Sequence, residues 1–215
     1  MEYFNRYPKG DAIAKDYSGM NIGLALSGGA DSALLLYLLA KMVKDRALSS
    51  DIICMHGIDT TMKIAVQPAE QIVEYVRNKF KNVNIILETF SYAIDPKKLN
   101  KNDYHQPYYN EYMKRHNIPK IIRAVTQGMP NNGRPIVDHD IPPEKLIKYS
   151  KDDITLPFGA VDKRWVKLQY RYQGIMDLAN ITASCIADIP DAPCRECWWC
   201  KERLWAFGNY DGGIQ

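Results

Sequence analysis

A polar hexapeptide, Ser-Gly-Gly-Ala-Asp-Ser over residues 27–32, separates two apolar runs near the start of the chain. Its two glycines allow a sharp backbone turn that points several N–H groups in one direction. A helix beginning at about Asp31 would add the positive end of its dipole, so the turn is suited to a phosphate-like anion. The serines can donate further hydrogen bonds, and Asp31 can hold Mg²⁺ or cap the helix. The alternative is a glycine-rich N-cap turn without a ligand, and the Gly-Lys-Ser/Thr ending of a P-loop is absent.

A second group of reactive side chains lies near the C-terminus, where four of the five cysteines are Cys185, Cys194, Cys197 and Cys200. Their C-x8-C-x2-C-x2-C spacing predicts a closed, tetrahedral zinc site of four thiolates. An iron–sulfur cluster and a redox pair are the competing interpretations. The fifth cysteine, Cys54, lies in an apolar run, where a small buried side chain is favoured over a nucleophile.

The elements that would position these groups alternate along the chain. Apolar runs predict strands, amphipathic or apolar stretches predict helices, and the order is typical of a doubly wound, mostly parallel α/β sheet. In such sheets ligands bind at the carboxyl ends of the strands, which is where residues 27–32 fall. The strands are predicted over 21–27, 51–57, 82–90 and 119–128, and the helices over 31–46, 68–80, 107–116 and 162–178; residues 129–153 are predicted to form a long loop with a short helix near 142–149.

Composition excludes few functions. The chain has 215 residues, 46% of them hydrophobic, and a net charge of +3, which is too mild to indicate nucleic-acid binding. The longest apolar stretch, residues 33–40, is too short to span a membrane, and the N-terminus lacks a secretory pattern. We therefore expect a cytoplasmic protein without a membrane or direct nucleic-acid partner, folded as one domain over 1–215 that includes the metal-binding segment 181–208.

The hexapeptide resembles the pyrophosphate-binding loop of the N-type ATP pyrophosphatases, or PP-loop superfamily. The resemblance implies an adenine nucleotide alpha hydrolase-like, Rossmann-like fold and cleavage of ATP between its α and β phosphates. It also implies that Asp31 and Ser32 act catalytically with Mg²⁺, and that adenine lies against the ends of the first two strands. The nucleotide-binding residues implied in this way are Ala25, Leu26, Ser27, Gly28, Gly29, Ala30, Asp31, Ser32, Ala33 and Met55.

Within that superfamily the cysteine segment is similar to the zinc site of the 7-cyano-7-deazaguanine synthases, the QueC/ExsB family. The family's Thr-x-Ser-Cys motif before the zinc site matches "TASC" at 182–185, and its Cys-x-x-Arg-x-x-Ala-Phe motif at the end of the site matches "CKERLWAF" at 200–207. The family's upstream stretch, which begins with a proline, matches residues 156–174. The last match implies that Lys163 is a catalytic, phosphate-side lysine that binds the nucleotide; the alternative is a cation on a helix surface. Arg203, three residues after Cys200, either has a functional role or is a solvated helix charge.

The middle of the chain departs from that family. Its Tyr-Gly-Gln-Arg-His run is replaced by "HGIDTT" at 56–61, and the Pro-Gly-Arg-Asn and Tyr-Pro-Asp-Cys-Arg segments are missing. In the family these segments contribute to substrate and subunit contacts. Their absence therefore bears on the identity of the acceptor substrate more than on the cleavage of ATP. Tyr104, Tyr108, Tyr109 and Tyr112 can stack a purine-like base or pack in the core, and "DHD" at 138–140 can bind a metal or form a solvated loop.

The resemblance therefore implies an ATP-dependent carbon–nitrogen ligase that uses ATP, Mg²⁺ and Zn²⁺ and functions as a homodimer. It would adenylate 7-carboxy-7-deazaguanine and add ammonia, giving 7-cyano-7-deazaguanine or its amide in queuosine biosynthesis. Two alternatives remain. One is a PP-loop enzyme that adenylates a tRNA, a protein or another small acid. The other is a catalytically silent nucleotide-binding module.

Overall fold

The centre of the protein is a parallel sheet. The computed structural model describes residues 19–60, 68–93, 102–129, 154–159, 161–186 and 192–214. Within these residues the sheet has five strands in the order β3-β2-β1-β4-β5, and every neighbouring pair is parallel. The strands are β1 (Ile22–Ala25), β2 (Ile52–Asp59), β3 (Ile85–Tyr92), β4 (Ile121–Arg123) and β5 (Ile154–Thr155).

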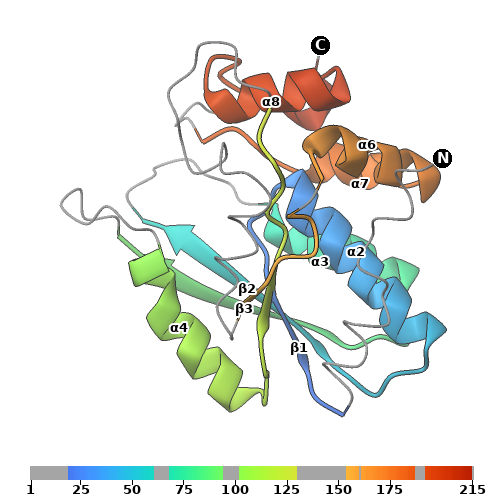
Figure 1. Cartoon of the computed structure of the whole chain (residues 1–215), viewed down its shortest axis with the longest axis vertical. Coiled ribbons are helices and arrows are strands. Elements are labelled where there is room, and N and C mark those ends of the chain that lie inside the picture. Colours follow the sequence, from blue (N-terminus) through green and yellow to red (C-terminus); the bar gives the residue numbers. More distant parts are fainter. Residues whose placement is uncertain are drawn as a thin grey trace.

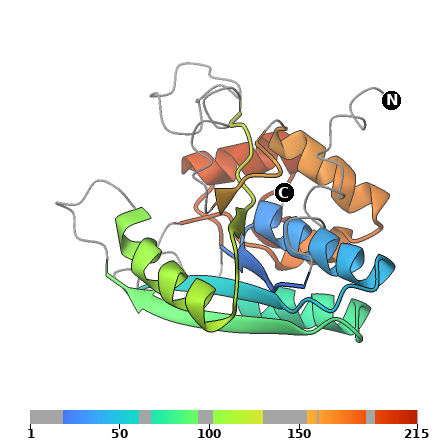
Figure 2. The ribbon, with the colours of Figure 1, turned by 60° about the horizontal axis from the view of Figure 1, so that its bottom comes forward.

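Helices cover both faces of this sheet. Alternate strand residues, such as Leu24 and Cys54, pack with α2 and α3, whereas Met55 and Ile121 on the opposite face pack with α4. Figure 1 shows α4 across the sheet from α2 and α3, and Figure 2 shows it lying over β2 and β3. The helices are α2 (Ala30–Asp45), α3 (Ala69–Lys79), α4 (Asn102–Arg115), α6 (Lys163–Tyr172), α7 (Met176–Ile181) and α8 (Trp198–Phe207), followed by the short 3-10 helix η3 (Asp211–Gly213).

This arrangement confirms the predicted fold class, a doubly wound parallel α/β sheet. Strand β1 lies in the middle of the sheet and leads directly into α2, whose apolar residues are buried almost throughout. Because β1 is central, the turn that follows it sits at the carboxyl edge of the sheet between neighbouring strands. Helices α6, α7 and α8 gather near the start of α2 (Figure 1). No helix among the described ranges is both long and apolar enough to cross a bilayer.

Side chains from the helices protect the edge strand β3. Carbonyl oxygens of Thr89 and Ser91 accept hydrogen bonds from Tyr112 and Tyr108, both at 3.0 Å. The guanidinium of Arg77 donates to the Ile85 carbonyl in the same way. Occupied carbonyls make an edge a poor template for pairing with another strand. These two tyrosines therefore pack and cap the sheet, as one of the two interpretations predicted.

The structure differs from the sequence predictions in three places. The helix expected over 162–178 is divided into α6 and α7, because Gly174 adopts φ = +67° between them. Helix α4 begins at Asn102, upstream of Pro107, rather than at the proline. The two-residue strand β5 was not predicted. The helix expected near 142–149 and the residues 138–140 lie outside the described residues, and the single domain over 1–215 stays a prediction.

Candidate functional site: a glycine loop and a cysteine cluster

The predicted phosphate loop, residues 27–32, lies at the carboxyl end of β1. The sheet ladder continues to Leu26, whose N–H donates to the Met55 carbonyl at 2.9 Å. Gly28 then turns the chain with φ = +85°, a conformation that L side chains rarely adopt. Gly29 is the N-cap of α2 and caps it without a side chain. Since the first N–H groups of a helix have no intrahelical partner, those at the start of α2 can bind an anion.

The two serines of the loop hold it in shape. The buried Ser32 hydroxyl donates to the Gly29 carbonyl at 3.1 Å and accepts from the Ser27 N–H at 3.2 Å. The two hydroxyl oxygens lie 3.0 Å apart, and the Ser27 hydroxyl accepts from the Gly29 N–H at 3.3 Å. Ser27 itself is exposed. Ser32 is therefore an internal brace, whereas Ser27 is the hydroxyl placed to meet a ligand.

A buried ion cluster adjoins the loop. The Lys163 ammonium, whose residue is only 4% exposed, lies 3.3 Å from the Asp31 carboxylate and donates to the Glu202 carboxylate at 2.8 Å. Burial acts to lower the pKa of Lys163, but the two carboxylates outweigh it and the pKa is raised. The lysine is therefore charged at neutral pH. The interpretation of Lys163 as an ordinary surface cation is wrong.

Asp31 keeps one oxygen for another partner. Its Oδ2 contacts Lys163, while its Oδ1 is buried and has no hydrogen-bond partner among the described parts of the chain. Mg²⁺ that accompanies a phosphate is usually held by one or two carboxylates and the phosphate oxygens, so a free carboxylate oxygen beside the glycine loop fits such a site. The structure thus brings together the charged and hydroxyl groups expected of residues 27–32 and Lys163.

The remaining predicted nucleotide residues lie around the loop. Leu26 and Met55 are buried, Ala25 is partly exposed, and Ala30 and Ala33 are buried in the first turn of α2. Both backbone polar groups of Leu26 are already occupied, since its carbonyl also contacts the His56 ring at 2.8 Å. The contact of adenine with these residues stays a prediction.

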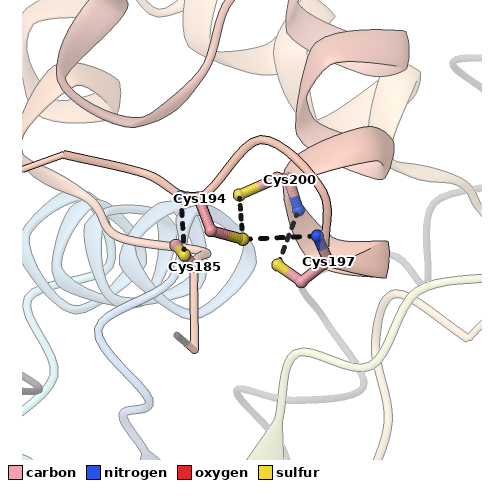
Figure 3. A group of neighbouring side chains, drawn as sticks. All are labelled: Cys185, Cys194, Cys197 and Cys200. Atoms are coloured by element: carbon pink, nitrogen blue, oxygen red, sulfur yellow. Dashed lines mark hydrogen bonds between the residues drawn. The ribbon is translucent and has the colours of Figure 1, made fainter. Parts of the chain in front are cut away.

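The four clustered cysteines form the second candidate site. Their four Sγ atoms all lie within 4.8 Å of one another, and the Sγ atoms of Cys194 and Cys200 are 3.9 Å apart. Cys197 and Cys200 come from the start of α8, and their side chains face those of Cys185 and Cys194 on the preceding chain (Figure 3). Backbone N–H groups donate to three of the sulfurs. Burial acts to raise the pKa of Cys194, but such donors lower it to about 7. Burial raises the pKa of the Cys197 and Cys200 thiols, so a metal would have to displace their protons. The spacing of the four sulfurs is suited to such a metal.

A polar frame holds this cysteine segment against the body of the protein. The Asp211 carboxylate accepts the N–H groups of Ser184 and Cys185 at 2.6 and 2.8 Å. The Arg203 guanidinium, 1% exposed, donates to the Thr182 hydroxyl at 2.6 Å and to the Ala179 carbonyl at 2.8 Å. The solvated interpretation of Arg203 is therefore wrong, and the contacts described for it are structural.

Two contacts connect the cysteine segment with the loop. Ala183, two residues before Cys185, donates its N–H to the Gly28 carbonyl at 3.1 Å. Glu202, two residues after Cys200, holds the ammonium of Lys163. Sequence reasoning did not single out Glu202, although it lies inside the "CKERLWAF" match. The signal available in the sequence was its place, two residues after Cys200 and next to Arg203.

Cys54 has no place in either site. It is fully buried in β2, and burial raises the pKa of its thiol to about 12. A protonated, enclosed thiol is a poor nucleophile. The interpretation of Cys54 as a small core residue agrees with this geometry.

We predict that Lys163→Met lowers the free energy of unfolding by about 3–5 kcal/mol, because it leaves two carboxylates close together without their cation. Adding Glu202→Gln should restore part of that loss, since one buried charge is removed. Lys167→Met on the same helix is the matched control and should change stability by less than about 0.5 kcal/mol. Urea unfolding measures all three. A Lys163→Met protein as stable as the wild type would contradict the buried cluster.

Comparisons with known proteins support the fold. No protein-family model and no curated protein sequence matches the chain. Among solved structures it is similar to the U34-tRNA thiolase NcsA from Methanococcus maripaludis with its [4Fe-4S] cluster, with a TM-score of 0.51 and 12% sequence identity. The match covers 73% of this chain and 58% of that chain, so the protein spans little more than half the length of the thiolase. At this identity the two chains share an α/β fold.

Proposed function

We propose that the protein is a PP-loop enzyme that cleaves ATP between its α and β phosphates and adenylates an acceptor. The observation that carries the proposal is the loop geometry: a glycine turn with φ = +85° at the end of a central parallel strand, followed by uncapped helix N–H groups. The free Oδ1 of Asp31 and the charged Lys163 stand beside it. A catalytically silent module would not need this charge arrangement, so we favour an enzyme.

The reaction uses these groups as follows. An oxygen of the acceptor carboxylate attacks the α-phosphorus of ATP, and the bond to the β-phosphate oxygen breaks, releasing pyrophosphate. Loop N–H groups and the Ser27 hydroxyl donate to the departing pyrophosphate, whose negative charge grows as the bond breaks. Lys163 contributes positive charge at the same place. Mg²⁺, when bound through Asp31, would neutralise phosphate charge. Ammonia then attacks the acyl carbon, and AMP leaves to give an amide.

For the acceptor we propose 7-carboxy-7-deazaguanine. Support comes from the sequence resemblance at both ends of the chain, over "SGGADS" and the "TASC" and "CKERLWAF" segments. With a second ATP, the amide oxygen attacks the α-phosphorus and pyrophosphate leaves. Loss of AMP together with both protons of the amide nitrogen then gives the nitrile. An enzyme that stops at the amide would need only the first ATP. We further propose a cytoplasmic homodimer, following the habit of that family.

A second acceptor class is a tRNA base. The solved structure that resembles this chain is described as a U34-tRNA thiolase, and the middle of the present sequence lacks the segments of the deazaguanine enzymes. In that case the loop would still bind pyrophosphate, and a sulfur nucleophile would displace AMP. The acceptor therefore distinguishes the two candidates, and the ATP chemistry is common to both.

For the four cysteines we propose a single zinc ion. Four Zn–S bonds of about 2.3 Å place tetrahedral sulfurs about 3.8 Å apart. Sulfurs within 4.8 Å of one another, two of them at 3.9 Å, are close to that geometry. A [4Fe–4S] cube sets four iron atoms between its thiolates and so requires them to lie farther apart. Zinc would join the segment before α8 to the helix that carries Glu202.

We predict that the purified protein converts Mg²⁺-ATP to AMP and pyrophosphate when 7-carboxy-7-deazaguanine and ammonium are present, with a nitrile or amide product by mass spectrometry. Asp31→Asn should slow AMP formation by about 10²-fold or more, since charge stabilisation at the leaving group is lost. Ser50→Ala, at the opposite end of the sheet, is the control. AMP formed only with tRNA would support the second acceptor. No AMP with carboxylate, tRNA or protein acceptors would contradict the proposed function.

We also predict about one zinc per chain by elemental analysis, without iron or acid-labile sulfide. Chelation should lower the melting temperature, and Cys197→Ser should bind zinc more weakly. Cys54→Ala should retain the metal, because Cys54 lies outside the cluster. Iron and sulfide in place of zinc would contradict the single-ion assignment, and a chelated protein with an unchanged melting temperature would contradict a structural role.

A further inference from the structure

His56, on β2, carries a polar atom that no residue described by the structure satisfies. The residue is 4% exposed, and its Nε2 atom is buried and has no hydrogen-bond partner. Its other ring nitrogen, Nδ1, lies 2.8 Å from the Leu26 carbonyl oxygen. Buried polar groups are nearly always paired, so an unsatisfied one calls for an explanation.

The hydrogen bond to Leu26 determines the state of the ring. A carbonyl oxygen only accepts hydrogen bonds, so Nδ1 must carry a proton. Burial lowers the pKa of His56, and the Leu26 carbonyl and Glu70 offset this only in part. The neutral ring then has its single proton on Nδ1, and Nε2 presents a lone pair. This nitrogen can accept a hydrogen bond and cannot donate one.

The contact of Nδ1 with Leu26 places the His56 ring next to the glycine loop. Leu26 immediately precedes Ser27, and its N–H is paired with Met55, the neighbour of His56 in β2. The ring therefore stands beside the first residue of the loop, at the carboxyl edge where β1 and β2 meet. If the loop binds the phosphates of a nucleotide, the nucleoside part would lie at this same edge of the sheet.

We propose that Nε2 of His56 accepts a hydrogen bond from an N–H or O–H donor on the nucleoside part of the bound nucleotide. His56 is then a specificity-determining residue, because a nucleotide without the donor would leave the buried acceptor unpaired. Two groups of ATP have the required chemistry, the exocyclic amino group of adenine and a ribose hydroxyl. The inference rests on the proposed function, since it assumes that the loop binds the phosphates.

The first experiment compares ligands that differ by one donor. Dissociation constants are measured for ATP, inosine triphosphate, 2′-deoxy-ATP, 3′-deoxy-ATP and inorganic pyrophosphate. Wild type should bind ATP about tenfold more tightly than the one analogue that lacks the relevant donor, corresponding to about 1.4 kcal/mol. In His56→Phe, which keeps the ring and removes the acceptor, that preference should disappear while pyrophosphate binding stays unchanged.

His116→Phe is the matched control. His116 lies near the amino end of β1, where its carbonyl accepts from Asn21, and its ring contacts Glu88. This variant should keep the wild-type preference. Loss of discrimination against inosine triphosphate in His56→Phe identifies the amino group, and loss against a deoxynucleotide identifies a hydroxyl. Equal ratios in wild type and His56→Phe would overturn the proposal and leave a buried water as the partner of Nε2.

A second measurement does not depend on a substituted protein that folds. In nitrogen-labelled wild type, NMR distinguishes protonated from bare ring nitrogens of the four histidines. We expect a proton on Nδ1 of His56 and a bare Nε2 whose resonance moves with ATP and stays in place with pyrophosphate. The opposite tautomer, or an equal shift with both ligands, would overturn the proposal. A protein that binds neither pyrophosphate nor ATP would instead refute the proposed function, so the two failures are distinguishable.

Discussion

A buried ammonium between two carboxylates is the interaction on which the site depends. Lys163 comes from α6, Asp31 from the start of α2, and Glu202 from α8, so one charge joins three elements that are distant in the sequence. Removing a charged group from water is costly unless it is paired well, and here the ammonium contacts both carboxylates. The cluster also fixes the ammonium beside the loop before any ligand arrives. Under the proposed function, a departing phosphate would meet a preorganised ammonium there.

The loop and the cysteine segment are parts of one framework. The backbone of Ala183 holds Gly28 on one side, and Glu202 reaches the loop through Lys163 on the other. Arg203 and Asp211 in turn bind the chain that leads to Cys185. A metal bound by the four thiolates would therefore constrain the same backbone that shapes the loop. This explains how a structural ion can matter to a site from which it is chemically separate.

Local patterns in the sequence predicted the alternation of strands and helices but only some of their boundaries. Apolar runs separated by helical stretches were enough to predict parallel strands, and the glycine turn fell at the carboxyl end of β1 as expected. The break between α6 and α7 depends on the left-handed backbone of Gly174, which periodicity does not reveal. Strand β5 has two residues and carries no pattern of its own.

The site was predictable where its residues are neighbours and less so where they meet through the fold. Residues 27–32 and the four cysteines can be identified from their spacing in the sequence. The burial of Lys163 depends on its pairing with Asp31 and Glu202. The tautomer of the His56 ring, on β2, depends on the carbonyl of Leu26, which follows the neighbouring strand β1. Pairings of that kind arise from strand register and helix packing, for which a single sequence gives no direct signal. They were visible only once the fold placed the elements together.

The most direct test of the account is a crystal structure of the protein with Mg²⁺ and a non-hydrolysable ATP analogue. We expect the β and γ phosphate oxygens to accept hydrogen bonds from the backbone of residues 28–32 and from the Ser27 hydroxyl, with Lys163 beside them. Phosphates bound elsewhere, with Ser27 and the glycines facing no phosphate oxygen, would contradict it.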